Sequence, residues 1–160
     1  MKGSYMARAP FQILVFPYIK ISETNSILYA VFRRSQEGYW QGIAGGGEEG
    51  ETILDAAKRE AFEEAEIPTS CKYKKLDSSS MLPVIDVVSD FLWGLDTYVV
   101  PEYSFGVEVG VKELLLSSEH KEFKWVTYEE AINILKWDSN KTAIWELNQR
   151  LLREDFSERE

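Results

Sequence analysis

The stretch that most constrains the fold of this chain is residues 45–67, which read GGGEEGETILDAAKREAFEEAEI. It begins with a glycine-rich, acidic segment that we expect to be a loop, and it continues as a helix. Thr52 and Asp55 form a pair similar to a capping box, so Thr52 is the expected N-cap. Because Pro68 disfavours helical geometry at the preceding residue, the helix is expected to end at Ile67 or just before it.

A cluster of carboxylates marks one side of the expected helix. Glu63 and Glu64 follow Glu60 by three and four positions, so at about 100° per residue all three side chains project from the same side. The adjoining apolar stripe, which is expected to pack inward, consists of Leu54, Ala57, Ala61 and Ala65. Like charges at this spacing destabilise a helix, whereas Mg²⁺ binds carboxylate oxygens. The cluster indicates either a magnesium site or a solvated acidic face.

The spacing over the whole stretch favours the magnesium site. Its glycine, charged and apolar positions recur at fixed intervals, at Gly45, Glu51, Arg59, Glu60, Glu63, Glu64 and Ile67. This pattern resembles the Nudix box, the signature of the Nudix hydrolases, and every charged position of the signature is filled. The departure is Glu66, where the family usually has a glycine. That glycine eases the exit from the helix, so its loss concerns a turn and not the metal ligands.

The resemblance implies a reaction and a role for each box residue. Nudix enzymes hydrolyse a nucleoside diphosphate linked to another group, using water activated on a divalent cation. Glu60, Glu63 and Glu64 match the family's positions for ligands of Mg²⁺, for which Mn²⁺ is an alternative. Arg59 matches the position that pairs with a box carboxylate and orients it. Gly45 either contributes its carbonyl to the metal and lets the backbone approach the ligand, or it only forms a tight turn.

Shorter matches outside the box resemble one branch of the family. They are YWQ at residues 39–41, SEH at 118–120, FKW at 123–125 and WDSNK at 137–141. Similar segments occur in the bacterial dihydroneopterin-triphosphate pyrophosphatases, also called dATP pyrophosphohydrolases. This likeness implies that Glu119 reaches the metal site, as a ligand or as the general base, although it could also be an ordinary loop acid. It also implies hydrolysis of a pterin or nucleoside triphosphate to a monophosphate and pyrophosphate.

Recognition of the substrate calls for aromatic and cationic side chains. The aromatic candidates for stacking on a ring are Tyr39, Trp40, Trp93, Tyr98, Tyr103 and Phe105, most of which should belong to the core. Arg33 and Arg34 are candidates for contacting the triphosphate, or they lie at a solvated strand end. We expect Arg33, Trp40 and Gln41 to form the substrate-binding set.

The remaining pattern predicts a single domain over residues 11–155, between a flexible lead-in at 1–10 and a frayed tail at 156–160. Strands are expected at residues 11–18, 27–33, 39–43, 71–80, 97–100, 103–109 and 122–126. Helices are expected at residues 128–135, with Thr127 as N-cap, and from Asp138 or Ser139 onward. Residues 81–93 have no clear periodicity. The resemblance implies the Nudix fold, of the α/β (α+β) class, with a mixed sheet sandwiched between helices as an α/β/α sandwich.

Composition limits the partners and the location. The net charge of −9 argues against nucleic acid as a partner, because phosphate backbones bind basic surfaces. An acidic enzyme that acts on phosphates needs a cation between its own carboxylates and the phosphate groups of the substrate. The single cysteine, Cys71, fits a reducing compartment, and a single histidine, His120, excludes multi-histidine zinc sites. With no segment that predicts a signal peptide or a membrane span, a soluble cytoplasmic protein is expected.

Three functions are compatible with these residues. The first is an Mg²⁺-dependent pyrophosphohydrolase of a pterin or nucleoside triphosphate, such as dihydroneopterin triphosphate or dATP. The second is a hydrolase of dinucleoside polyphosphates or nucleotide sugars, and the third is a non-catalytic Nudix-like module that binds a nucleotide and regulates a partner. Non-catalytic modules usually lose box glutamates, so the complete box favours an enzyme. The oligomeric state stays open, a homodimer included.

Overall fold

The computed structural model describes residues 7–110, 112–117 and 120–155. Within these residues the chain forms one seven-stranded sheet and four helices. In chain order the elements are β1 (Arg8–Ile21), β2 (Ser26–Arg34), β3 (Trp40–Gln41), β4 (Ile43–Glu48), α1 (Ile53–Ala65), β5 (Tyr73–Pro83), α2 (Val84–Val88), β6 (Val99–Glu108), β7 (His120–Val126), α3 (Tyr128–Ile134) and α4 (Asp138–Leu152).

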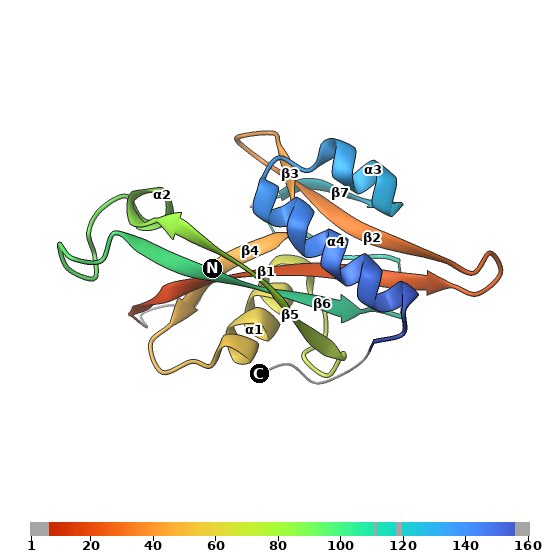
Figure 1. Cartoon of the computed structure of the whole chain (residues 1–160), viewed down its shortest axis with the longest axis horizontal. Coiled ribbons are helices and arrows are strands. Elements are labelled where there is room, and N and C mark those ends of the chain that lie inside the picture. The colour runs from red at the N-terminus through yellow and green to blue at the C-terminus, as the bar shows by residue number, and fades with distance from the viewer. Residues whose placement is uncertain (1–6, 111, 118–119, 156–160) are drawn as a thin grey trace.

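The longest strand, β1, is the centre of the sheet (Figure 1). On one side it pairs in parallel with β6, which in turn pairs with β5. Its antiparallel partners are β4, along its first half, and β2, along its second half. Both β3 and β7 pair with β2. The sheet is therefore mixed, as the sequence resemblance implied.

Two hydrophobic clusters lie on the two faces of the sheet. One contains the alanines of α1, packed against alternate residues of the central strands such as Ile13 and Val15. The other contains Ile144 and Leu147 of α4, packed against the alternating set that includes Leu14. This alternation follows from the two-residue period of a strand, which sends neighbouring side chains to opposite faces. The α/β/α layering predicted from the family resemblance is confirmed.

The helix predicted from the box stretch is α1, and both of its ends match the prediction. The side chain of Thr52 accepts a 3.0 Å hydrogen bond from the backbone N–H of Asp55. At the other end, Glu66 adopts a left-handed conformation with φ of 53°, and its N–H is directed to the carbonyls of the last turn. The predicted stripe was wrong at one position, because Leu54 is 40% exposed while Ala57, Ala61 and Ala65 are buried.

Several boundaries differ from the prediction; the strand expected at 39–43 is divided into β3 and β4, and the one expected at 71–80 is β5 at 73–83. Strand β1 begins at Arg8, so residues 8–10 belong to the sheet and not to a lead-in. Residues 45–47 lie in β4 and not in a loop. The predicted break at Pro101 is absent, since β6 is continuous across it. Pairing of β6 with β1 starts at Glu102, so Pro101 lies where only β5 is a partner and its missing N–H is tolerated.

The two C-terminal helices are those predicted, with one correction. Thr127 and Glu130 form a complete capping box at the start of α3. The cap of α4 is Trp137, without a side-chain hydrogen bond, so Asp138 is the first helical residue and not the cap. Residues 81–93, which show no clear periodicity in the sequence, include the end of β5 and the short helix α2. None of the helices in the described part of the chain is long and apolar enough to cross a membrane.

Candidate active site

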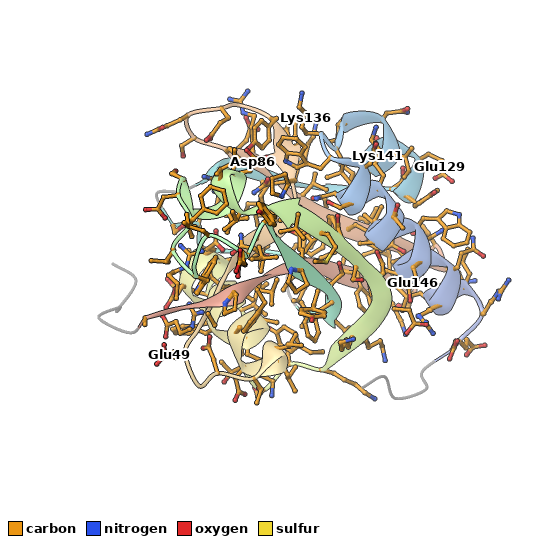
Figure 2. All side chains as sticks on the ribbon, turned by 60° about the vertical axis from the view of Figure 1, so that its left-hand side comes forward. Glu49, Asp86, Glu129, Lys136, Lys141 and Glu146 are labelled. Carbon is orange, nitrogen blue, oxygen red and sulfur yellow. The ribbon has the colours of Figure 1, made fainter. Side chains whose placement is uncertain are left out.

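A cavity of about 630 Å³ opens beside the box helix. Its lining combines residues from α1 and the start of α4 with residues from strands β1 to β6. Representative lining residues are Glu60, Gly46, Gln12, Glu102, Ser80 and Ser139. Asp86 of α2 also lines it, whereas Glu129 of α3 lies well away from Asp86 (Figure 2). The cavity thus brings residues from both faces of the sheet to one opening.

Arg59 is the centre of a network at the α1 side of this cavity. Its Nε and Nη2 donate hydrogen bonds of 2.7 and 3.0 Å to the two carboxylate oxygens of Glu51. Its Nη2 also donates to the backbone carbonyl of Gly46 at 2.8 Å. Its Nη1 lies 3.0 Å from Oε1 of Glu60 and 3.3 Å from Oε1 of Glu63. One guanidinium therefore joins β4 and the loop before α1 to the carboxylates of the helix.

The charges in this network stabilise one another. Hydrogen bonding to Glu51 raises the pKa of Arg59 further above its ordinary value, although burial opposes this rise. Burial acts to raise the pKa of Glu51, but the hydrogen bonds from Arg59 and from the Glu48 backbone outweigh it and lower the pKa. The paired, ionised forms are thus the stable ones near neutral pH. Arg59 offsets part of the repulsion that the clustered carboxylates would otherwise cause.

The glycines of β4 make the close approach of α1 and β1 possible. A Cβ on Gly45 would lie 2.2 Å from Cδ of Glu60, and a Cβ on Gly46 would lie 2.3 Å from Nη2 of Arg8. Real Cβ atoms do not come this close to neighbouring atoms. Glycine at these positions therefore admits a carboxylate and a guanidinium directly against the strand backbone. For Gly45 this close approach, and not a tight turn, is what the strand geometry requires.

The three predicted metal ligands differ in burial. Glu60 and Glu64 are 1% and 0% exposed, and the Glu63 side chain is 24% exposed. Of the three, Glu60 lines the cavity, together with Gly45 and Arg59. Glu119 lies outside the described residues. The solvated acidic face considered from the sequence is therefore excluded for Glu60 and Glu64, because both carboxylates are buried.

The donor set near Arg59 fits a hard divalent cation in its chemistry. All its side-chain donors are carboxylate oxygens, which Mg²⁺ prefers. The missing Cβ of Gly45 lets the Glu60 carboxylate lie against the backbone of β4, and Glu60 and Glu63 lie close enough to contact the same Nη1 atom of Arg59. Within the described residues, no three acidic, histidine or cysteine side chains form a complete metal-binding group. The carboxylates are held instead by Arg59.

The model of the Nudix domain family matches residues 19–144 of this chain. The chain belongs to the Nudix family. It is an enzyme of that family, a pyrophosphohydrolase.

Three relatives of this Nudix enzyme illustrate the range of similarity. A Nudix hydrolase from Listeria monocytogenes is 42% identical, with a TM-score of 0.84 over 94% of this chain and 100% of that one. The dihydroneopterin triphosphate diphosphatase of Escherichia coli (strain K12) is 28% identical over 86% of this chain and 91% of that protein. An Ap4A hydrolase from C. elegans is 20% identical, with a TM-score of 0.69 over 91% of this chain and 99% of that one, and this likeness shows the fold alone.

The predicted substrate-binding set is divided by the structure of this Nudix enzyme. Gln41 lines the cavity and is 8% exposed. Arg33 does not line it, because its Nε pairs with Oε1 of Glu122 at 3.1 Å across β2 and β7. Trp40 is also absent from the lining, since its ring packs beneath Nζ of Lys124 at 4.8 Å. Adjacent strand residues point to opposite faces, which separates Trp40 from Gln41.

Among the described residues, the aromatic side chains that line the cavity are those of Tyr39 and Trp137. Their ring centroids lie 5.3 Å apart with an edge-to-face angle of 81°. Tyr39 is one of the residues expected to stack on a ring, whereas Trp137 belongs to the WDSNK segment and is not among them. The remaining candidates do not line the cavity; they are Trp93, Tyr98, Tyr103 and Phe105.

Several lining residues were not predicted from the sequence. Arg8 lies beside Gly46 and donates a 3.2 Å hydrogen bond to Gln12. Glu102 lies on β6, next to the prolyl residue that had suggested a strand break. Ser139 and Asn140 lie in the first turn of α4, and Asn140 is 3% exposed. The sequence carried no direct signal for Glu102, because residues 101–102 fall between two expected strands and the burial of the carboxylate is visible only in the structure.

Proposed function

We propose that this Nudix enzyme is an Mg²⁺-dependent pyrophosphohydrolase that cleaves a pterin or nucleoside triphosphate to the monophosphate and pyrophosphate. The observation that carries the proposal is the joint lining of one cavity by Glu60 and Arg59 at one part and by Gln41, Tyr39 and Trp137 at another. A triphosphate ester has the same two parts, an anionic chain and a flat ring. The name of the E. coli relative, dihydroneopterin triphosphate diphosphatase, supports this substrate class.

The acidic part of the site would hold the cation. Glu60, Glu63 and Glu64 are the proposed ligands, with the carbonyl of Gly45 as a further donor. When bound, Mg²⁺ or Mn²⁺ lowers the pKa of water and neutralises charge on phosphoryl oxygens. Arg59 holds Glu60 and Glu63 in place through Nη1, which limits the reorganisation needed for binding.

Other side chains of the chain would bind the substrate and take up the proton of the attacking water. Arg8 and Arg34 line the cavity and would contact the phosphate chain through their guanidinium groups. Tyr39 and Trp137 would provide apolar surface for the ring. Glu119 is the proposed general base, because a carboxylate that arrives from another segment is less occupied by metal than the box glutamates.

The physiological setting follows from the same considerations. A net charge of −9 favours a small-molecule substrate over nucleic acid. We place the enzyme in the cytoplasm, which suits a chain whose single cysteine, Cys71, is free. Whether it acts as a monomer or as a homodimer does not affect the proposed chemistry, because all proposed site residues come from one chain.

The test is a panel of substrates assayed with the full chain and Mg²⁺. It contains dihydroneopterin triphosphate, dATP, dGTP, a diadenosine polyphosphate and ADP-ribose, and it distinguishes release of pyrophosphate from release of phosphate. We expect the highest kcat/KM, with pyrophosphate as product, for a triphosphate. Faster turnover of the diadenosine polyphosphate or ADP-ribose would replace this proposal by the second function. Tight binding with no turnover of any compound would favour a regulatory module.

The matched control for this panel is a pair of Glu→Gln variants. Glu60→Gln removes a charge that lines the cavity, whereas Glu129→Gln removes an exposed charge on α3. We expect Glu60→Gln to abolish most turnover and Glu129→Gln to behave as the unmodified chain. If the two changes affect turnover equally, this cavity is not the site of the activity.

A further inference from the structure

We propose that Glu102 is the specificity-determining residue of the site and accepts hydrogen bonds from two adjacent N–H groups on the substrate ring. Such a pair is present on a 2-amino-4-oxo ring edge, the edge that pterin and guanine share, and it is absent from adenine. This inference rests on the proposed function, because it names the ring class that the same cavity receives. It assigns a role to a buried carboxylate that the box chemistry does not use.

The first observation is the position of Glu102 in the sheet. A single row of cross-strand partners runs through the lining of the cavity, in the order Gly46 on β4, Gln12 on β1, Glu102 on β6 and Ser80 on β5. Neighbouring strands lie about 4.8 Å apart, so about 10 Å separates the backbones of Gly46 and Glu102. Gly46 accepts a hydrogen bond from Arg59 and lies beside Arg8, which is proposed to contact the phosphate chain. Glu102 therefore lies two strands from the phosphate part, within the same cavity.

The second observation is the open hydrogen-bonding capacity of this carboxyl group. Glu102 is 6% exposed, and its Oε1 atom has no hydrogen-bond partner in the structure. Among the described residues no cation lies within ion-pair distance of Glu102. Burial raises the pKa of Glu102 to about 7, although a hydrogen bond from Ser139 acts against the rise. A buried acceptor without a partner is costly in free energy, and a ligand donor in the cavity would remove that cost.

The third observation is a chain of hydrogen bonds that orients the group. The backbone N–H of Gly42 donates to Oδ1 of Asn140 at 2.8 Å, which leaves Nδ2 of Asn140 to donate to Oγ of Ser139 at 3.4 Å. With its oxygen accepting from Asn140, the Ser139 hydroxyl has its proton available for Glu102, to which its side chain is hydrogen-bonded. Glu102 is thereby held as an acceptor: Oε1 has no partner in the structure, and a carboxylate that accepts from Ser139 keeps further lone pairs for a second ligand N–H.

An acceptor held in this way distinguishes between ring edges. An amide N–H next to an amino group offers two donors to a carboxylate, whereas the corresponding edge of adenine offers one donor and one acceptor. At a pH above the pKa of about 7, where Glu102 is ionised, the adenine edge would place two acceptors against each other and leave a buried group unpaired. Sites built on buried hydrogen bonds discriminate strongly against such ligands.

The first test measures kcat/KM for dGTP, dATP and inorganic tripolyphosphate with the full chain and with Glu102→Gln. We expect the unmodified enzyme to prefer dGTP, and we expect Glu102→Gln to reduce the dGTP:dATP ratio by about 10–100-fold. Turnover of tripolyphosphate, which has no ring, should not change. An unchanged ratio in Glu102→Gln would overturn the inference and leave the proposed hydrolysis intact.

The second test separates this inference from the proposed hydrolysis. Calorimetric binding of GMP and AMP to the full chain, in chelator, needs neither metal nor turnover. We expect GMP to bind more tightly than AMP, with a difference that Glu102→Gln and Ser139→Ala both reduce and that Glu129→Gln leaves unchanged. Equal binding of the two nucleotides, or tighter binding of AMP, overturns the assignment. If the chain hydrolyses none of the substrates but still binds GMP more tightly than AMP, the proposed function is overturned and the role of Glu102 is not.

Discussion

The backbone N–H of Ser117 donates a 2.9 Å hydrogen bond to the backbone carbonyl of Glu64, in the last turn of α1. Carbonyls in a last turn have no partner within the helix, so this bond satisfies one of them from a separate segment. Leu114 and Leu116 of that segment pack against the same hydrophobic cluster as α1. The chain that leads to Glu119 is thus attached to the helix that carries the box carboxylates. Glu119 itself lies outside the described residues.

Glu119→Gln should lower kcat much more than it weakens substrate binding. If Glu119 is the general base, the loss is about 10²–10⁴-fold, because the amide cannot accept the proton of the attacking water. If it is a ligand only, raising Mg²⁺ should restore part of the rate. Steady-state kinetics over a range of Mg²⁺ concentrations distinguish the two roles. Unaltered kcat and metal dependence would identify Glu119 as an ordinary loop acid, leaving the box as the whole acidic site.

Activity should require a divalent cation, and the cation should also stabilise the fold. A ligand that binds the folded state alone raises the free energy of unfolding, so Mg²⁺ is expected to raise the melting temperature. The increase should be smaller in Glu60→Gln, which lacks one proposed ligand charge. Thermal denaturation with Mg²⁺, with Mn²⁺ and with excess chelator measures this effect beside the rate. Full activity in excess chelator would refute the metal requirement.

Glu64→Gln should reduce turnover by orders of magnitude and leave the fold intact. The change removes one anionic ligand while keeping the shape of a fully buried side chain. In chelator, the melting temperature of the variant should equal or exceed that of the unmodified chain, because one of several clustered charges has been removed. Turnover at the unmodified rate with saturating Mg²⁺ would show that Glu64 is not a ligand.

Glu66→Gly should raise stability and leave catalysis nearly unchanged. Glu66 has a φ of 53°, a conformation that costs a non-glycine residue about 1–2 kcal/mol. Part of the gain is lost to the greater freedom of glycine in the unfolded chain, so we expect a net increase of about 0.5–1 kcal/mol. Denaturant unfolding and kcat/KM together test this expectation. A large loss of activity would reveal a role of Glu66 in the reaction.

Without ligand, the stability of the chain should fall as the pH rises from about 4.5 to about 7. Glu102 has a folded pKa of about 7 against an ordinary value of 4.5, so in this window the unfolded state binds fewer protons. Below about pH 4.5 Glu102 is protonated in both the folded and the unfolded state, so the free energy of unfolding is not reduced. Above about pH 7 the reduction is complete and amounts to at most about 3 kcal/mol. In Glu102→Gln this loss should be missing. Urea unfolding of both proteins at pH 5 and pH 8 measures the difference.

The box helix could be predicted from the sequence because its determinants are local. Thr52 and Pro68 define its ends within one turn, and the spacing of Glu60, Glu63 and Glu64 does not depend on the rest of the fold. The left-handed residue at the exit was likewise predictable, since the family's glycine at position 66 indicates a turn. Only Leu54 was misplaced, because its helical position alone does not say how far the opposing sheet extends.

The rest of the cavity depends on strand register, which is not local. Glu102 and Gln12 are distant in sequence and become neighbours through the parallel pairing of β1 with β6. Arg33 and Arg34 could not be distinguished for the same reason, since the face that each occupies depends on the partner strands of β2. The strand prediction failed at Pro101 because a proline is tolerated in a strand only where its missing N–H faces no partner. Where β1 begins to pair with β6 cannot be read from the local sequence.

The three successive glycines of β4 have a consequence for how this enzyme can vary. Beyond the Glu60 carboxylate at Gly45 and the Arg8 guanidinium at Gly46, a Cβ on Gly47 would lie 2.0 Å from the Phe11 ring. A methyl group added at each of these three positions in turn would therefore displace the Glu60 carboxylate, the Arg8 guanidinium and the Phe11 ring. A side chain is therefore least tolerable at Gly45 and Gly47, where a buried carboxylate or a rigid ring would have to shift, and more tolerable at Gly46, where the flexible end of Arg8 can move away.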